Sequence, residues 1–178
     1  MKEILNSIIV KKGDITKEKC DAIVNAAAPP LLGGGGVDGA IHRAAGPGLL
    51  EVCRKLGGCR HGEARITGAY NLPTKFVIHT PGPVYKDGKS NEAEILKNSY
   101  YNSLLLSKKE KLSSIAFPAI STGVYGYPKA EAAEIAVNSV IDFMKNEDYL
   151  LKVIFVLFDE ESMRIYNKII EGKNNELS

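Results

Sequence analysis

The 178-residue sequence has few cysteines, no tryptophan and no long apolar run. Its three cysteines, Cys20, Cys53 and Cys59, are odd in number and form no C-x-x-C pair, so a disulfide-rich secreted domain is disfavoured and reduced thiols are expected. No apolar stretch reaches membrane-spanning length, and Met1–Val10 carries charge without the apolar core of a signal peptide. We therefore expect a cytoplasmic protein without a membrane partner.

A strong excess of either charge is also missing. The chain has 23 Lys and Arg against 21 Asp and Glu, for a net charge of +2, and no basic run, so we expect no specific nucleic-acid partner. This balance is compatible with an anionic small ligand. Cys53, Cys59 and His61 lie close in sequence, but their spacing matches no common zinc pattern, so we expect no metal site.

Length and composition are those of one globular domain, with 44% hydrophobic and 25% charged residues and no visible repeat. We predict a single domain over residues 1–171 and a frayed tail over 172–178, where Gly172 opens a polar stretch. Short β-branched runs alternate with helical patterns, which favours a layered α/β fold.

The expected strands are Ile8–Lys11, Ala22–Asn25, Glu63–Gly68, Phe76–Thr80, Ser114–Ala119 and Lys152–Leu157. The expected helices are Val37–Ala45, Ala93–Ser107, a helix from Pro128 through Val140, and Glu161–Ile170. Gly46-Pro47-Gly48 stops the first of these helices. Because the last two helices flank the last strand in sequence, we predict a helix–sheet–helix sandwich.

The most informative feature is a run of four glycines, Gly33–Gly36, between an expected strand and an expected helix. Glycines let the backbone approach a phosphate without a Cβ in the way. The unpaired N–H groups and the dipole of the following helix favour an anion at that point. A flexible surface loop is the alternative, since four glycines are entropically costly to order, but anchoring on both sides favours a phosphate cradle.

A second strand-to-helix loop, Pro118–Pro128, has the same character, with two hydroxyl side chains, two glycines and two tyrosines. Such turns gather at the carboxyl edge of a parallel sheet, where ligands of open α/β folds bind. Neither loop is a Walker A motif or a dinucleotide-binding G-x-G-x-x-G. Together the two loops indicate a diphosphate that is gripped from both sides.

Asp38 stands in the first helical turn after the glycines. A carboxylate there can simply stabilise the helix N-terminus. Beside a phosphate it is repelled, however, so its presence also fits a chemical role, in which it orients a water or a ribose hydroxyl. His42 lies one turn later and can face Asp38. We interpret His42 and His79 as structural, and no nucleophile elbow suggests a serine hydrolase.

Several blocks resemble the MacroD type of macrodomain: Gly13–Thr16, Asp21–Ala27, Leu31–Gly46, Val77–Pro83 and Ile120–Pro128. The resemblance extends from about Gly13 to Phe158, nearly the whole chain. It implies a three-layer α/β/α sandwich with a mixed central sheet and a cleft for ADP-ribose. It also implies hydrolysis of the ester that joins ADP-ribose to Asp or Glu side chains of proteins, and deacetylation of O-acetyl-ADP-ribose, without a metal or another cofactor.

The same resemblance implies roles for single residues. Asp14 hydrogen-bonds the adenine amino group with Ile15 beside it, and Phe158 packs on the adenine. Asn25 and Asp38 lie at the distal ribose. Tyr125 of the second loop covers the distal ribose. The two glycine-rich loops hold the diphosphate, and their site residues, besides Tyr125, are Gly33, Gly34, Gly35, Gly36, Val37, Ser121, Thr122, Gly123 and Val124.

One position departs from the family pattern Asn-Ala-Ala-Asn, because Ala28 stands where the second asparagine is usual. Catalysis is expected from Asp38 and Asn25, and the carboxamide missing at Ala28 would have oriented the ribose and the water. Loss of such a group commonly costs on the order of 10²-fold in rate. The leading hypothesis is a hydrolase with reduced turnover, and the alternative is a non-catalytic reader of ADP-ribosylated proteins. We expect a monomer whose partners are ADP-ribose and mono-ADP-ribosylated proteins.

Overall fold

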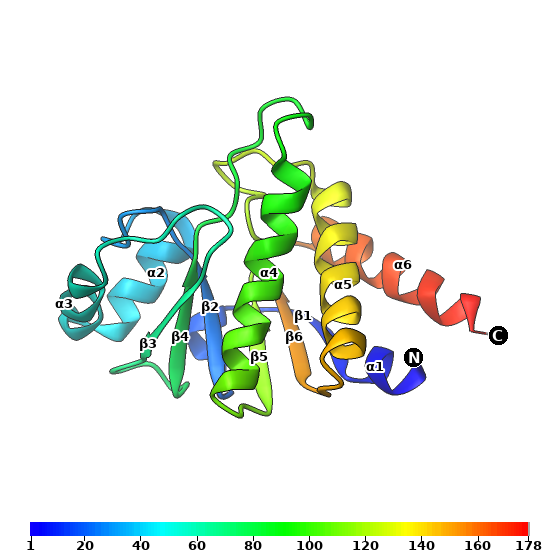
Figure 1. Ribbon diagram of the computed structural model, residues 1–178, viewed down its shortest axis with the longest axis horizontal. Coiled ribbons are helices and arrows are strands. Elements are labelled where there is room, and N and C mark those ends of the chain that lie inside the picture. Colours follow the sequence, from blue (N-terminus) through cyan, green and yellow to red (C-terminus); the bar gives the residue numbers. More distant parts are fainter. Residues whose placement is uncertain (178) are drawn as a thin grey trace.

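A six-stranded sheet forms the centre of the structure, a computed structural model that describes residues 1–177 (Figure 1). The strands lie in the order β1-β6-β5-β2-β4-β3. Their bounds are β1 Ile8–Lys12, β2 Ala22–Ala26, β3 Arg65–Gly68, β4 Phe76–Thr80, β5 Ser114–Phe117 and β6 Lys152–Leu157. Neighbouring strands pair in parallel except β3, which is antiparallel to β4, so the sheet is mixed.

All six strands that the sequence predicts are present, with small differences at their ends. The strand expected from Glu63 begins at Arg65, and the strand expected to reach Ala119 ends at Phe117, directly before Pro118. In β6 every residue after Lys152 is buried, as expected for a continuous apolar run that is covered on both faces.

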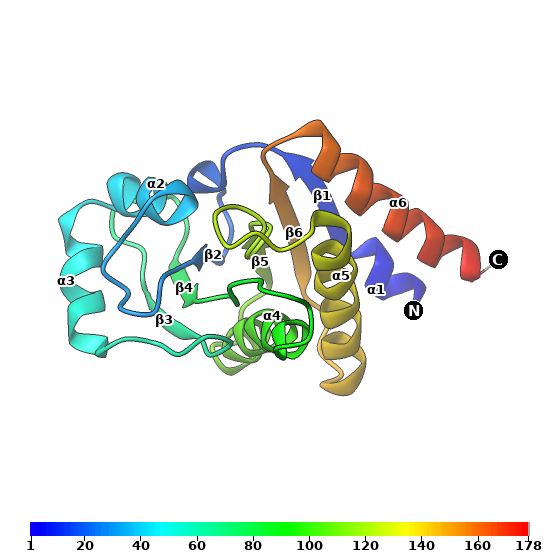
Figure 2. The same ribbon diagram turned by 90° about the horizontal axis from the view of Figure 1, so that it is seen from above.

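Helices cover both faces of the sheet and give the three expected layers (Figure 2). Their bounds are α1 Lys2–Asn6, α2 Gly36–Ala45, α3 Pro47–Leu56, α4 Glu92–Lys109, α5 Lys129–Asn146 and α6 Glu160–Glu176, with a 3-10 turn, η1, over Ile15–Lys17. One core cluster joins α4, α5 and α6 to the sheet, and a second joins α2 and α3 to the opposite face. None of the helices in residues 1–177 is long and apolar enough to cross a membrane.

Three elements lie outside the sequence predictions. α1, η1 and α3 are short, and α3 starts at Pro47, within the tripeptide that was interpreted only as a stop signal. Gly46 at φ 84° ends α2 and proline then occupies the first turn of α3, where its missing N–H is not needed. The helix is held by Leu49 and Cys53, which are fully buried.

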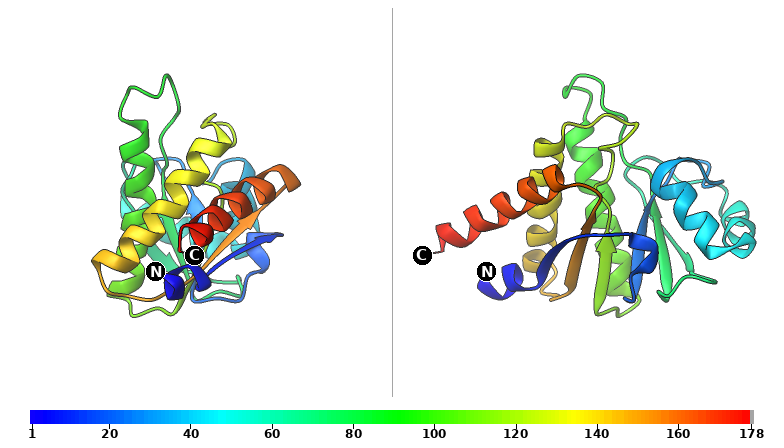
Figure 3. Two further views of the ribbon diagram at one scale, coloured as in Figure 1. Left: turned by 90° about the vertical axis from the view of Figure 1, so that its right-hand side faces the viewer. Right: turned by 180° about the vertical axis from the view of Figure 1, so that it is seen from behind.

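The predicted tail differs most from the structure. α6 continues through Glu176, so the polar stretch from Gly172 that was expected to fray is helical, while Ser178 lies outside the described residues. α6 packs on α5 and on β1, and α1 lies beside it at the same edge of the molecule (Figure 3). The buried residues of α6, Ser162 and Tyr166, lie in its first half, and near its end Lys173 lies 4.0 Å from Glu134 of α5.

A crevice forms where β2 and β5 lie side by side. The helix after β2 covers one face of the sheet and the helix after β5 covers the other, so the two connections leave the sheet in opposite directions. The β2–β5 ladder holds only two residue pairs, whereas β2 and β4 share five. Ligands of open α/β sheets bind at such points, outside the carboxyl ends of the strands.

Candidate functional site

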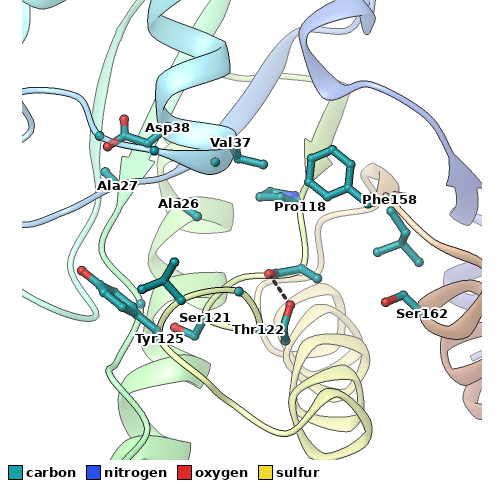
Figure 4. Close-up of a pocket in the computed structure, with 18 of the residues that line it drawn as sticks. Ala26, Ala27, Val37, Asp38, Pro118, Ser121, Thr122, Tyr125, Phe158 and Ser162 are labelled. Atoms are coloured by element: carbon teal, nitrogen blue, oxygen red, sulfur yellow. Dashed lines mark hydrogen bonds between the residues drawn. The ribbon is translucent and has the colours of Figure 1, made fainter.

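A cavity of about 580 Å³ opens at the carboxyl ends of β2, β5 and β6 (Figure 4). Its size falls within the range of roughly 300–1,000 Å³ that is usual for small-molecule sites. Of the residues proposed from sequence, twelve line it: Ala28, Gly34, Gly35, Gly36, Val37, Asp38, Ser121, Thr122, Gly123, Val124, Tyr125 and Phe158. Four others, Asp14, Ile15, Asn25 and Gly33, lie outside the lining.

The first wall is the start of α2. Gly35 is its N-cap and offers no side chain, and the N–H groups of Gly36, Val37 and Asp38 make no hydrogen bond within residues 1–177. A Cβ added at Gly35 would meet nothing within 4 Å, so the space above the loop is open. Free N–H groups at a helix start, next to open space, form a site for an anion.

The second wall is the loop between β5 and α5. Ser121 adopts φ 67°, which is unusual for a residue with a side chain, and its hydroxyl donates to the Pro83 carbonyl oxygen at 2.8 Å. Thr122 donates to the Ala119 carbonyl oxygen at 3.0 Å (Figure 4). The N–H groups of residues 122–125 make no hydrogen bond within residues 1–177. Two rows of unbonded donors therefore line one cavity.

The segment between β4 and α4 supports the second wall. A Cβ at Gly82 would collide with Ser121 and Ile120, so only glycine permits this close approach. The Tyr85 N–H donates to the Tyr125 carbonyl oxygen at 2.9 Å. The position of Tyr125 at the cavity thus depends on a segment that starts more than forty residues earlier in the chain.

One buried carboxylate, Glu92, organises this supporting segment. It accepts four backbone N–H groups at 2.7–3.1 Å, from Lys86, Asp87, Gly88 and Ser90. These bonds favour the ionised form and lower the pKa of Glu92 to about 2. The segment is therefore held by one charged side chain.

Asp38 lies at the cavity with little exposed surface. Its Oδ1 accepts a hydrogen bond from Asn25 Nδ2 at 2.9 Å. His42 faces Asp38, as the helical spacing predicts, with Nε2 3.5 Å from Oδ1, but the geometry makes no hydrogen bond. Asn25 itself is fully buried behind Asp38, so it supports the cavity wall and does not form it.

Phe158 marks the opposite end of the cavity, where its ring is 69% exposed. The Gly13 N–H donates to the Leu157 carbonyl oxygen at 3.0 Å, which brings the Asp14 segment to the end of β6. Asp14 caps η1, and its Oδ1 accepts from the Thr16 N–H at 3.0 Å and from the Thr16 hydroxyl at 2.7 Å. These two bonds lower the pKa of Asp14.

Other lining residues were not proposed from sequence: Ala26, Ala27, Gly82, Pro118, Ala119, Lys129, Val156, Leu157, Asp159 and Ser162. Most of them end a strand or follow one, so the carboxyl-edge rule could have found them. Lys129 pairs with Asp159 at 3.3 Å and with Glu161 at 3.2 Å, so carboxylates offset the charge of this rim cation.

Cys53, Cys59 and His61, which were considered as metal ligands, each contact other groups. Cys53 is buried 3.7 Å from His79 Nε2, and His61 Nδ1 lies 2.8 Å from the Gly82 carbonyl oxygen. Burial raises the pKa of the Cys53 thiol to about 11. Within residues 1–177 no group of three or more His, Cys, Asp or Glu side chains could hold a metal ion.

A mixed sheet between two helical layers, with a cleft between two glycine-rich loops, defines the class of protein. The Macro domain family matches residues 24–136, over half of the chain, and the chain belongs to this family. The O-acetyl-ADP-ribose deacetylase of Escherichia fergusonii is 54% identical to it over 173 residues, which cover 95% of this chain and 98% of that protein.

Solved structures agree with this assignment. The Oceanobacillus iheyensis macrodomain with ADP has a TM-score of 0.89 and 46% identity, covering 94% of this chain and 91% of that one. The Trypanosoma brucei macrodomain in complex with ADP-ribose has a TM-score of 0.88 and 43% identity, covering 94% of this chain and 71% of that one.

Proposed function

We propose that this protein binds ADP-ribose in the cavity and hydrolyses esters of its distal ribose. The substrates are O-acetyl-ADP-ribose and mono-ADP-ribose that is ester-linked to Asp or Glu side chains of proteins. The observation that carries the proposal is the pair of loops with unbonded N–H groups around one cavity, next to the carboxylate of Asp38. The name of the Escherichia fergusonii relative and the ligand of the Trypanosoma brucei structure support it.

The cavity offers a contact for each part of ADP-ribose. The N–H groups at the start of α2 and in residues 122–125 receive the diphosphate, with help from the α2 dipole. The exposed face of Phe158 stacks on adenine, and Asp14 accepts its amino group. The distal ribose then lies at Asp38, beneath Tyr125.

The proposed reaction needs little acid assistance. For the Asp or Glu ester, water attacks C1″ of the distal ribose, the bond between C1″ and the ester oxygen breaks, and the carboxylate leaves with the electron pair. The water oxygen becomes the ribose hydroxyl and one proton is released. For O-acetyl-ADP-ribose, water adds to the acetyl carbonyl carbon, the bond to the ribose oxygen breaks, and that oxygen takes a proton as acetate is released. Because a carboxylate is a good leaving group, the site has mainly to hold the water and fix the ribose. Asp38 performs this task by accepting hydrogen bonds from water or ribose hydroxyls, and the substrate's diphosphate helps to bind the water.

Ala28 favours a second candidate function. It lines the cavity without a polar group, and Asn25, the remaining asparagine of the motif, is buried behind Asp38. A site with few groups to position water suits a reader that binds ADP-ribosylated proteins without turnover. We propose weak hydrolysis first, because Asp38 is retained at the cavity.

Binding is tested by calorimetry. We expect micromolar affinity for ADP-ribose, about −8 kcal/mol, and weaker binding of AMP, which leaves the second phosphate and distal ribose positions empty. No heat and no thermal shift at millimolar ADP-ribose would refute both the hydrolase and the reader.

Catalysis is tested by single-turnover release from a glutamate-ADP-ribosylated protein, for the parent, Ala28→Asn and Asp38→Ala. We expect Ala28→Asn to raise the rate with little change in ADP-ribose affinity, and Asp38→Ala to abolish it. Glu51→Ala, an exposed carboxylate paired with Arg54 away from the cavity, is the matched control. If Asp38→Ala hydrolyses at the parent's rate, Asp38 is not a catalytic residue. If Ala28→Asn binds ADP-ribose tightly but does not hydrolyse the substrate, the protein is a reader.

A further inference from the structure

A chain of buried polar side chains runs from the cavity wall into the sheet. Asn25 of β2 and His79 of β4 are paired in register, and both are fully buried. Asn25 Nδ2 lies 2.9 Å from Asp38 Oδ1 and 3.3 Å from His79 Nδ1. On the far side of the ring, His79 Nε2 lies 3.0 Å from Thr67 Oγ1 in β3. Three strands are thus linked to one carboxylate at the cavity.

From Asn25 into the sheet the donors point the same way, and Asn25 also donates outward to Asp38. The Thr67 hydroxyl donates its hydrogen to the Gly68 carbonyl oxygen at 2.9 Å, so towards His79 it can only accept. His79 therefore carries its hydrogen on Nε2. Burial lowers the pKa of His79 to about 3, so the ring is neutral and Nδ1 is free to accept.

This arrangement locks the amide of Asn25. Its two N–H groups face two acceptors, His79 Nδ1 and Asp38 Oδ1. If the Asn25 amide were flipped, its oxygen would face both His79 Nδ1 and Asp38 Oδ1, and these contacts between acceptors are repulsive. Asn25 donates to Oδ1 of Asp38. The second carboxylate oxygen, Oδ2, has no hydrogen bond within residues 1–177, so it can accept one from a water or a ribose hydroxyl.

We propose that His79 is a positioning residue for the hydrolysis: as the Nε2–H tautomer it fixes the Asn25 amide, which in turn orients the carboxylate of Asp38 towards the substrate. The kinetic part of this inference rests on the proposed function. The hydrogen-bond chain itself does not, and it can be measured in the protein without substrate. A merely structural His79 would affect stability but not the orientation of Asp38.

The first test is direct. Long-range ¹H–¹⁵N correlation spectra of the histidine rings at neutral pH should show His79 protonated at Nε2 and unprotonated at Nδ1. Thr67→Val, which removes the acceptor for Nε2–H, should shift the ring towards the Nδ1–H tautomer, whereas Thr67→Ser should not. A ring that is protonated at Nδ1 in the parent would overturn the proposal, whether or not the protein is a hydrolase.

The second test separates positioning from packing. His79→Asn keeps an acceptor near the place of Nδ1, and His79→Leu has none at similar volume. In the Ala28→Asn background we expect His79→Leu to lower kcat roughly 10- to 100-fold, with KM and ADP-ribose affinity within about threefold of the parent, and His79→Asn to recover most of kcat.

Cys53→Ala is the matched control, because it removes only the long thiol contact 3.7 Å from His79 Nε2 and leaves the contacts among Thr67, His79, Asn25 and Asp38 in place. It should lower the melting temperature and keep kcat. Equal kcat for His79→Leu and His79→Asn, or a loss confined to the melting temperature, would overturn the positioning role. If His79→Leu fails to fold, the tautomer measurement on the parent and on Thr67→Val decides. Absence of hydrolysis in every variant, with the expected tautomer present, would refute the proposed function alone.

Discussion

Asp14 lies in the segment that Gly13 joins to the end of β6, and within residues 1–177 only Oδ1 of its carboxylate accepts hydrogen bonds, both from Thr16. In the proposed binding mode, the other carboxylate oxygen would accept the amino group of adenine but not the carbonyl oxygen of hypoxanthine. Asp14→Ala should therefore weaken ADP-ribose binding by roughly 1.5–3 kcal/mol, the range for hydrogen bonds to charged groups. Calorimetry of the two proteins measures the difference directly.

Asp14→Asn is the sharper variant at this position. Its oxygen must keep capping Thr16, which leaves the amide N–H₂ for the base. The variant should therefore prefer the hypoxanthine counterpart of ADP-ribose, whereas the parent prefers adenine. An unchanged base preference would mean that Asp14 lies outside the binding site.

Sequence motifs predicted some residues of the site and missed others. The glycine-rich blocks predicted the loops that line the cavity, because a strand, glycines and a helix start carry a local physical meaning. Asn25 was expected at the ribose, yet it is buried, since the direction of a strand side chain depends on which face the sheet covers. Asp159 and Ser162 were missed because their place at the cavity follows from a strand end and not from a motif.

At the scale of elements, the segment between β4 and α4 depends on Glu92. The folded pKa of about 2 lies below the ordinary value of 4.5, so the stabilising effect is complete above pH 4.5 and is lost as the pH falls towards 2. Glu92→Gln should lower the melting temperature near neutral pH, because its amide N–H₂ meets backbone donors, and the gap to the parent should narrow below pH 4.

Thermal unfolding between pH 3 and pH 7 checks this expectation, with Glu94→Gln as the control, an exposed acidic residue in the same helical turn. Since Tyr85 in this segment bonds Tyr125 at the cavity, Glu92→Gln should also weaken ADP-ribose binding. A gap that stays constant over the whole pH range would show that Glu92 does not act through its charge.

Strands were the more predictable elements. Each of the six is a β-branched or aromatic run between turn residues, and such runs have few alternative structures. α3 could not be read in the same way, because Pro47 is at once a stop for α2 and a start for the next helix. α6 extends past Gly172 although most of its residues there are exposed, and the weak helix propensity of this end did not predict the extension.

For the whole molecule, His79 makes stability sensitive to acid. Its folded pKa of about 3 lies below the ordinary 6.5, so the unfolded chain binds a proton that the folded protein does not. Stability should therefore fall as the pH drops from 6.5 towards 3, with a slope of about 1.4 kcal/mol per pH unit from this one group.

Urea unfolding between pH 4 and pH 7 tests this contribution. In His79→Asn the slope of the free energy of unfolding against pH should be smaller by the contribution of one bound proton. The control is His61→Asn, at an exposed histidine, and the effect is assigned to His79 if this control keeps the parent's slope. Identical slopes in the parent and in His79→Asn would place the acid sensitivity elsewhere.

The short ladder between β2 and β5 gives the fold a seam. With two residue pairs it is the shortest in the sheet, and it lies between β1, β6 and β5 on one side and β2, β4 and β3 on the other. The cavity lies across this ladder at the carboxyl ends of β2 and β5, so a diphosphate bound by both loops would link the two sets of strands. Hydrogen–deuterium exchange at residues 22–23 and 115–116 should then slow more with ADP-ribose than exchange in the outer strands β1 and β3, and AMP should slow it less. Binding of the ligand in the cleft would thus stabilise the pairing of β2 with β5, and through it the folded state of the whole sheet.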